Sequence, residues 1–153
     1  MKKNLKLFFL IGLIFLNNQF DLRSDDFYFE GQEIQILNDG NKLLSKKGIK
    51  ITSNDDLVFE GNEFEYNKLT QELILSDDVR ITDITRNIKI KTDKLKYIKK
   101  KQKLFTENFT EININNKYKI KSKNIVFDRS KEILSSNQKT SIKDKYKNKL
   151  ISN

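Results

Sequence analysis

The sequence predicts an all-β domain made of about four stacked repeats of roughly 30 residues each. Three observations carry this prediction. An apolar pattern returns about every 30 residues between positions 27 and 142, apolar and polar residues alternate within each copy, and the alternation breaks at the same place in every copy. A sustained repeat of this length is typical of stacked architectures, and a period of two is typical of half-buried strands.

Each copy centres on one large apolar residue, and these anchors are 30, 31 and 30 residues apart: Ile36, Tyr66, Tyr97 and Phe127. The positions nine, seven and two before each anchor, and seven and fifteen after it, are apolar in all four copies. A single copy cannot bury such a face alone, so we expect the copies to share one interior. A further position, twelve or thirteen after the anchor, is Lys139 in the last copy and apolar in the first three, where it is Ile49, Val79 and Phe109.

The break in the alternation is a step of five between two apolar residues, as from Phe59 to Phe64. An odd step shared by all copies predicts a shared bulge or corner, and Gly31 and Gly61 stand where the chain would bend. Polar segments mark the turns between strands: Asn38–Asn41, Asn67–Lys68, Lys99–Lys101 and Asp128–Ser130.

Residues 1–24 are predicted to be a signal peptide or a short N-terminal anchor. Lysines at positions 2, 3 and 6 precede an uninterrupted apolar run of ten residues, Leu7–Leu16. A spanning helix needs about 20 apolar residues, so the length favours a signal peptide. No small-x-small cleavage site follows, which leaves an uncleaved anchor open. The repeats fill residues 25–144, and residues 145–153 form a polar tail in which we expect fraying.

The composition excludes most catalytic chemistry. The chain has no cysteine and no histidine, which removes thiolate and imidazole metal sites and the histidine-dependent triads. It also has no nucleophile motif and no glycine-rich phosphate loop. We therefore expect neither an enzyme, nor a cofactor, nor a metal site. Two acidic pairs, Asp55–Asp56 and Asp77–Asp78, fall at strand junctions, where such pairs more often cap turns than hold a cation.

A nucleic-acid partner is disfavoured despite the net charge of +9. The segment Lys96–Lys103 is basic and contains an aromatic residue, as nucleic-acid-binding segments often do. The repeat places a turn there, however, and an export signal would remove the chain from nucleic acid.

One stretch resembles a known family. The second copy carries Glu60–Asn67, Leu73 and Val79–Ile81, and the first copy ends in Gly48–Ile51. This pattern resembles the repeat of the OstA-like family, which includes the periplasmic lipopolysaccharide-transport protein LptA and the N-terminal domain of the outer-membrane assembly protein LptD. The likeness covers about residues 27–144 and departs from the family pattern at two positions, Asp77 in place of a glycine and Lys139 in the last copy.

The resemblance implies a twisted, open β-jellyroll whose interior holds the acyl chains of lipid A. It implies a periplasmic location, with or without association with the inner or outer membrane. The implied partners are lipopolysaccharide, other jellyroll domains bound head to tail, and a membrane-associated complex. The candidate lining of the lipid-binding groove is a set of apolar and aromatic residues: Phe27, Phe29, Phe59, Phe64, Tyr66, Ile90, Tyr97, Ile120 and Phe127.

Lysines alternate with apolar residues in the second half of the chain, and they are candidates for a rim that meets the phosphates of the head group. A solvated strand face explains each of them equally well. The set comprises Lys89, Lys91, Lys94, Lys96, Lys119, Lys121 and Lys123.

Two classes of function stay open. An interior with room for hydrocarbon favours lipid transport, whereas a closed and fully packed interior favours an exported scaffold that binds only protein. Within transport, the alternatives are a free periplasmic bridge protein, a membrane-anchored partner of the LptC kind, and the N-terminal piece of a longer LptD-like chain. The first is favoured because the chain as given lacks the many further strands of a barrel.

Charge is unevenly divided along the chain. Residues 25–83 carry a net charge of −8, and residues 84–153 carry +14. Stacked repeats place early and late copies at opposite ends, so the domain is predicted to be an electric dipole. Head-to-tail contact between domains would bring opposite charges together.

Overall fold

The computed structural model describes residues 20–23 and 26–152, and nearly all of them lie in antiparallel strands or in the turns between them. This confirms the predicted all-β class. The predicted signal or anchor segment lies, up to residue 19, outside the described residues. Within the described part of the chain, no helix has the length and apolar character needed to cross a membrane.

A single 15-stranded sheet folds over into two layers. Three strands run through both layers: β8 (Glu72–Asp83), β9 (Ile88–Ile98) and β10 (Lys103–Ile114). The layer with more strands, called the long layer, also contains β1 (Phe20–Arg23), β2 (Phe27–Gly31), β5 (Ile49–Ser53), β6 (Leu57–Gly61), β11 (Tyr118–Lys123), β14 (Thr140–Asp144) and β15 (Lys149–Ser152). The other, called the short layer, also contains β3 (Gln35–Leu37), β4 (Lys42–Ser45), β7 (Glu63–Asn67), β12 (Val126–Asp128) and β13 (Ile133–Ser135).

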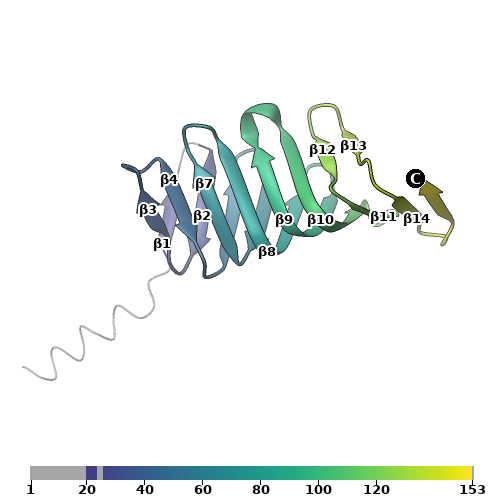
Figure 1. Ribbon diagram of the computed structural model, residues 1–153, viewed down its shortest axis with the longest axis horizontal. Helices are drawn as coiled ribbons and strands as arrows, with labels where there is room; N and C mark the ends of the chain where they lie inside the picture. Colours follow the sequence, from purple (N-terminus) through teal and green to yellow (C-terminus); the bar gives the residue numbers. More distant parts are fainter. Residues whose placement is uncertain (1–19, 24–25, 153) are drawn as a thin grey trace, which may run out of the picture.

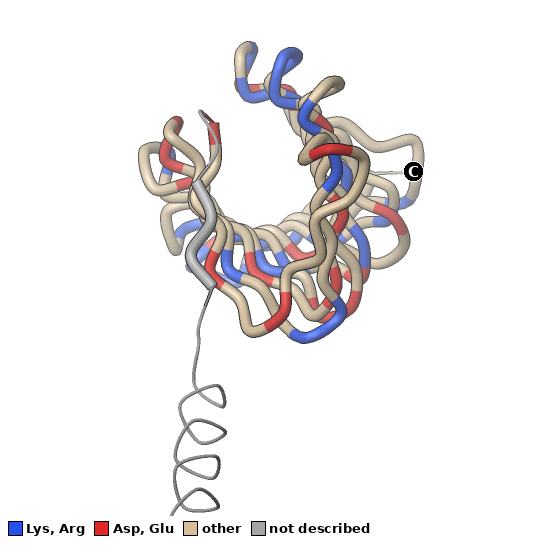
Figure 2. The backbone as a smooth tube through the Cα atoms, turned by 90° about the vertical axis from the view of Figure 1, so that its left-hand side faces the viewer, with Lys and Arg blue, Asp and Glu red and all other residues tan. Residues whose placement is uncertain are grey.

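The strands lie side by side along the long axis of the molecule (Figure 1). Seen along that axis, the backbone forms an arch that is open at the top (Figure 2). The arrangement is the open, twisted β-jellyroll that the resemblance implies.

The predicted step of five marks the place where the chain crosses from the long layer to the short layer. Such crossings lie between β2 and β3, between β6 and β7, within β9, and between β11 and β12. The return crossings are bent, because the pairing register shifts between Ser76 and Val79 in β8 and between Glu107 and Thr110 in β10. The corner expected from the sequence is therefore confirmed in every copy.

Strand pairing places the repeating apolar positions in two continuous rows, one on the inner face of each layer. The short-layer row consists of directly opposed residues Ile36, Leu43, Tyr66, Leu73, Tyr97, Leu104, Phe127 and Leu134. The long-layer row consists of Phe29, Ile51, Phe59, Ile81, Ile90, Ile112, Ile120, Ile142 and Leu150. Most of these side chains belong to one hydrophobic cluster between the layers.

Four expectations differ from the structure. Tyr118, which stands nine residues before the Phe127 anchor, is 49% exposed at the start of β11. Phe109 is 50% exposed, because the bend at Asn108 shifts the alternation by one residue and turns the buried Thr110 inward. Ile36 is 54% exposed, because β3 is the edge strand of the short layer. The tail expected to fray instead forms β15, which pairs with β14 from Lys143 to Thr140.

Candidate functional site

The nine residues predicted to line a groove all lie in the interior between the two layers. Eight of them are at most 4% exposed, and Ile120 is partly buried. The structure thus brings together the whole predicted set, which comprises Phe27, Phe29, Phe59, Phe64, Tyr66, Ile90, Tyr97, Ile120 and Phe127.

Aromatic rings fill the interior at its N-terminal end. The centroid of the Phe27 ring is 5.1 Å from that of Tyr66, in an edge-to-face arrangement. The Phe29 and Phe64 centroids are 5.6 Å apart, and those of Phe59 and Tyr97 are 5.3 Å apart. These separations fall in the favourable range for aromatic pairs. The N-terminal end of the interior is therefore occupied by the protein's own side chains.

The interior becomes uncovered at the C-terminal end, because the long layer continues past the last strand of the short layer. In Figure 1, β14 and the C-terminal strand extend beyond β13. Along the long-layer row, the exposed fraction rises from 0% at Ile112 to 64% at Leu150, with Ile120 and Ile142 partly buried between them. An apolar surface continuous with the core thus reaches solvent at this end.

The open side of the arch, called the mouth below, is where turns of the two layers meet. Polar side chains link these turns across the mouth. At its N-terminal end, Asp26 of the long layer accepts a hydrogen bond of 2.7 Å from Gln71 of the short layer. Asp26 also forms an ion pair of 3.1 Å with Lys99.

Asp55 continues these contacts along the mouth. Its carboxylate accepts hydrogen bonds from the Tyr97 hydroxyl at 2.9 Å and from Gln102 at 2.7 Å. Burial raises the pKa of Asp55, but hydrogen bonds from Ser53, Gln102 and Tyr97 together with the charge of Arg129 outweigh it and lower the pKa to about 2. Burial and the neighbouring Asp55 charge raise the pKa of Tyr97. Asp55 is therefore ionised at neutral pH, and Tyr97 keeps its proton.

Arg129 forms the centre of the mouth. Its Nε donates to Asp83 Oδ2 at 2.8 Å and its Nη1 to Asp55 Oδ2 at 3.0 Å, so it binds two carboxylates of the opposite layer. Burial lowers the pKa of Arg129, but the hydrogen bond to Asp83 and the two acidic charges raise it above its ordinary value. Arg86 extends the network, because it contacts both Asp83 and Glu132. The two layers are thus held together across the mouth by buried, charge-assisted contacts.

The seven lysines predicted to form a head-group rim lie on the outer faces of the layers, away from the mouth: Lys89, Lys91, Lys94, Lys96, Lys119, Lys121 and Lys123. Five of them pair with carboxylates on the same outer face, at 2.7–3.5 Å. This placement corresponds to solvated strand faces that balance their charges in pairs.

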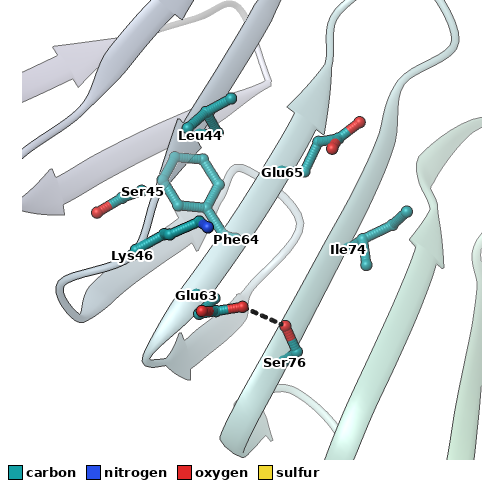
Figure 3. A pocket seen from close by; sticks show the side chains of 8 residues that line it. All are labelled: Leu44, Ser45, Lys46, Glu63, Phe64, Glu65, Ile74 and Ser76. Carbon is teal, nitrogen blue, oxygen red and sulfur yellow. Dashed lines mark hydrogen bonds between the residues drawn. The ribbon is translucent and has the colours of Figure 1, made fainter.

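A small pocket lies on the outer face of the short layer (Figure 3). In it Glu63 accepts a hydrogen bond of 3.3 Å from Ser76. The lining combines three apolar residues with one lysine, two glutamates and two serines, so its chemistry favours no ligand class. The lining residues are Leu44, Ser45, Lys46, Glu63, Phe64, Glu65, Ile74 and Ser76.

Sequence reasoning missed the residues of the mouth. It placed Arg129 in a polar turn and gave Asp83 no role. One signal was present: Asp83 follows Val79 and Ile81 at an inward position of its strand, where a charged residue needs a partner. Among the described residues, no group of histidine, cysteine, aspartate or glutamate is arranged to hold a metal ion.

Comparisons with known proteins agree with this architecture. Residues 52–134 match the family model described as lipopolysaccharide-assembly, LptC-related. Among solved structures, the chain is similar to LptH, described as the LptA homologous periplasmic component of the lipopolysaccharide transport device from Pseudomonas aeruginosa. The TM-score is 0.65 at 7% sequence identity, over 83% of this chain and 94% of LptH, which shows a shared fold. A search of curated proteins gave no match.

Proposed function

The chain belongs to the LptC-related family of lipopolysaccharide-assembly proteins, and from this premise we propose that it is a periplasmic component of lipopolysaccharide transport whose interior shields the acyl chains of the lipid. The observation that carries the proposal is the long-layer row, which runs unbroken from the buried core at Ile112 to the exposed Leu150. An acyl chain laid along this row removes its own methylenes and those side chains from water.

The energetics favour an extended apolar surface over a single pocket. Each buried methylene contributes about 0.8 kcal/mol, so a lipid gains stability in proportion to the length of row that it covers. Adjacent strands in the row are about 4.8 Å apart, so an extended acyl chain that runs along the row crosses one strand about every four methylenes. A row that continues from strand to strand therefore suits a long, unbranched chain.

The C-terminal end of the interior is the first place of contact. The aromatic rings at the N-terminal end already fill the space between the layers, so a lipid there must displace them or part the mouth. Ile120, Ile142 and Leu150 need no such displacement, because they are partly or largely exposed. In this proposal the eight predicted lining residues that are fully buried take up lipid only after the C-terminal end is occupied.

Other jellyroll domains are the protein partners in this proposal. Among the described strands, both layers end in strands with one free side: β1 and β3 at the N-terminal end, and β13 and β15 at the C-terminal end. Such strands can accept a further strand from another domain. The acidic first half and the basic second half would orient this contact head to tail. Among the three placements, the family match favours a partner of the LptC kind.

Site-specific photo-crosslinking in cells tests the lipid proposal. A photoreactive residue at Ile142, which points inward, is expected to capture lipopolysaccharide, and one at Phe64 is expected to capture it less efficiently. The matched control is Lys89, which points outward from the same layer. Capture from Lys89 at the yield of Ile142 would contradict an interior site. If neither inward position captures lipid, the packed interior supports the protein-binding scaffold instead.

A further inference from the structure

Three lysines form an unbroken row on the outer face of the long layer at its C-terminal end. Lys119 on β11 is directly opposite Lys143 on β14, which is directly opposite Lys149 on β15. These three, called the lysine row below, line a surface pocket together with Lys121 and Ser141. Like charges that face each other on adjacent strands destabilise a sheet. The stability of the sheet alone therefore does not explain why three lysines are opposed in this row.

The neighbouring outer row of the same layer shows how this sheet otherwise arranges its charges. From Glu30 to Lys121 its directly opposed residues largely alternate in sign from strand to strand, and within that stretch the like-charged neighbours Arg80 and Lys91 both bind Asp78. The row consists of Glu30, Lys50, Glu60, Arg80, Lys91, Glu111 and Lys121. The lysine row has no comparable acidic member.

The positive charge of the lysine row is largely uncompensated within the protein. Glu111 pairs with Lys119 at 2.7 Å and with Lys121 at 3.0 Å, so both of its carboxylate oxygens are already engaged. Across residues 26–152, no salt bridge involves Lys143 or Lys149. The nearby Asp144 accepts hydrogen bonds from its own turn, including 2.9 Å from the backbone of Tyr146. Lys143 and Lys149 are thus available to bind an external anion, and Lys119 adds its charge beside them.

We propose that the lysine row is a phosphate-binding site. Ammonium groups on three adjacent strands about 4.8 Å apart can together contact a group that carries two or more negative charges. A single isolated lysine would bind such a group only weakly in water. The chemistry fits a diphosphate, or the phosphorylated head group of an amphiphile.

The inner face of the same three strands supports the amphiphile as the occupant, a step that rests on the proposed function. Each lysine of the row is adjacent in sequence to a residue of the long-layer row: Ile120, Ile142 and Leu150. Among the described strands, β15 pairs with β14 alone, so its other side is a free edge. An amphiphile that lies across this edge places its acyl chains on the inner face and its phosphate on the outer face.

The first test uses inorganic pyrophosphate and needs no lipid. Binding to the full chain is measured by isothermal titration at low salt for the wild type, Lys143→Gln and Lys89→Gln. Lys89 lies in the same outer row but is flanked by Thr82 and Asn113, so it is a matched single lysine. Loss of one charge-assisted contact is expected to weaken binding about tenfold in K143Q. K89Q is expected to change it less than about twofold. Equal effects of both variants, or no binding to the wild type, would overturn the site.

The second test distinguishes the source of the phosphate. Photo-crosslinking from Ile142 is repeated with a phosphatidic acid and with the diacylglycerol that has the same acyl chains. Preferential capture of the phosphatidic acid, lost in K143Q, supports the amphiphile as occupant. Equal capture of both lipids, with pyrophosphate binding still dependent on Lys143, supports a site for a soluble diphosphate. Absence of any lipid capture would remove the proposed function but not the phosphate site, because the pyrophosphate titration decides the latter alone.

Discussion

Arg129 and Asp83 are 46 positions apart in the sequence, yet Arg129 Nε lies 2.8 Å from Asp83 Oδ2, and the exposed fractions of their side chains are only 3% and 2%. The two residues come from opposite layers, so this pair closes the mouth at its centre. A buried ion pair of this kind is weak evidence for net stability, but the loss of one partner leaves an uncompensated buried charge.

Replacing Arg129 is therefore expected to be strongly destabilising. Arg129→Met leaves the buried Asp83 without its strongest partner, and we expect the free energy of unfolding to fall by about 3–5 kcal/mol. Arg80→Met is the control, because Arg80 pairs with Asp78 on the exposed outer face. This variant should lower the free energy of unfolding by less than about 1 kcal/mol. Urea unfolding of both variants measures the difference. Similar losses in the two variants would show that the mouth contributes little to stability.

The stability of the domain is expected to fall in acid through Asp55. The folded-state pKa of Asp55 is about 2, below its ordinary value, so the ionised carboxylate contributes stability above about pH 4. That contribution is lost as the pH falls from about 4 through about 2. Urea unfolding across this range should show a smaller decline for Asp55→Asn than for the wild type. Asp39→Asn is the control, because Asp39 lies in an exposed turn. The stability of this variant should decline with falling pH as that of the wild type does.

The return crossings between the layers depend on a left-handed backbone. Gly48, Asp78 and Asn108 stand 30 residues apart, and their φ angles are +67°, +49° and +64°. Gly48→Ala is expected to lose about 1–2 kcal/mol of stability, because open space surrounds the position and only backbone strain acts. Gly48→Asn should lose less, since asparagine tolerates this conformation. Thermal unfolding of the two variants provides the comparison, and an alanine variant as stable as the wild type would refute the account.

Self-association is expected to weaken as salt rises. The net charges of −8 in residues 25–83 and +14 in residues 84–153 attract across a head-to-tail contact. The Debye length falls from about 10 Å at 0.1 M salt to about 3 Å at 1 M, so this attraction is screened over that range. Light scattering at high protein concentration should show larger species at low salt. A chain that stays monomeric throughout, alone and with other jellyroll domains, would remove the stacking proposal.

The repeat made the inner rows predictable, because each row position recurs four times in the sequence. Positions that depend on the bend were not predictable in the same way. Phe109 looks like a core residue by its distance from Tyr97, but the left-handed residue Asn108 rotates it outward. The sequence pattern shows alternation within a strand, but it does not show where a bulge adds one residue and shifts the alternation that follows. Thr110 therefore occupies the inward position, and because its side chain is polar, the apolar pattern did not indicate that it is buried.

The mouth was not predictable for a different reason. Its contacts join turns that are distant in sequence, such as Asp55 with Arg129, and polar residues in turns are ordinarily exposed. Only the curvature of both layers brings these turns into contact. The lysines posed the opposite difficulty: alternation correctly placed Lys94 and Lys96 outward, but it could not tell an outer face from the rim of an opening.

The in-register rows also bear on how such a domain can change in evolution. Each copy contributes two strand segments to each layer, so duplicating one unit of about 30 residues would lengthen the molecule by about 10 Å. Both apolar rows would remain aligned across the junction, because the new strands would repeat the pairing of their neighbours. Gain or loss of an odd number of residues within a strand would instead move the inward side chains that follow to the outer face. Whole-unit duplication is therefore the route by which the length of the apolar surface can be adjusted without rebuilding the fold.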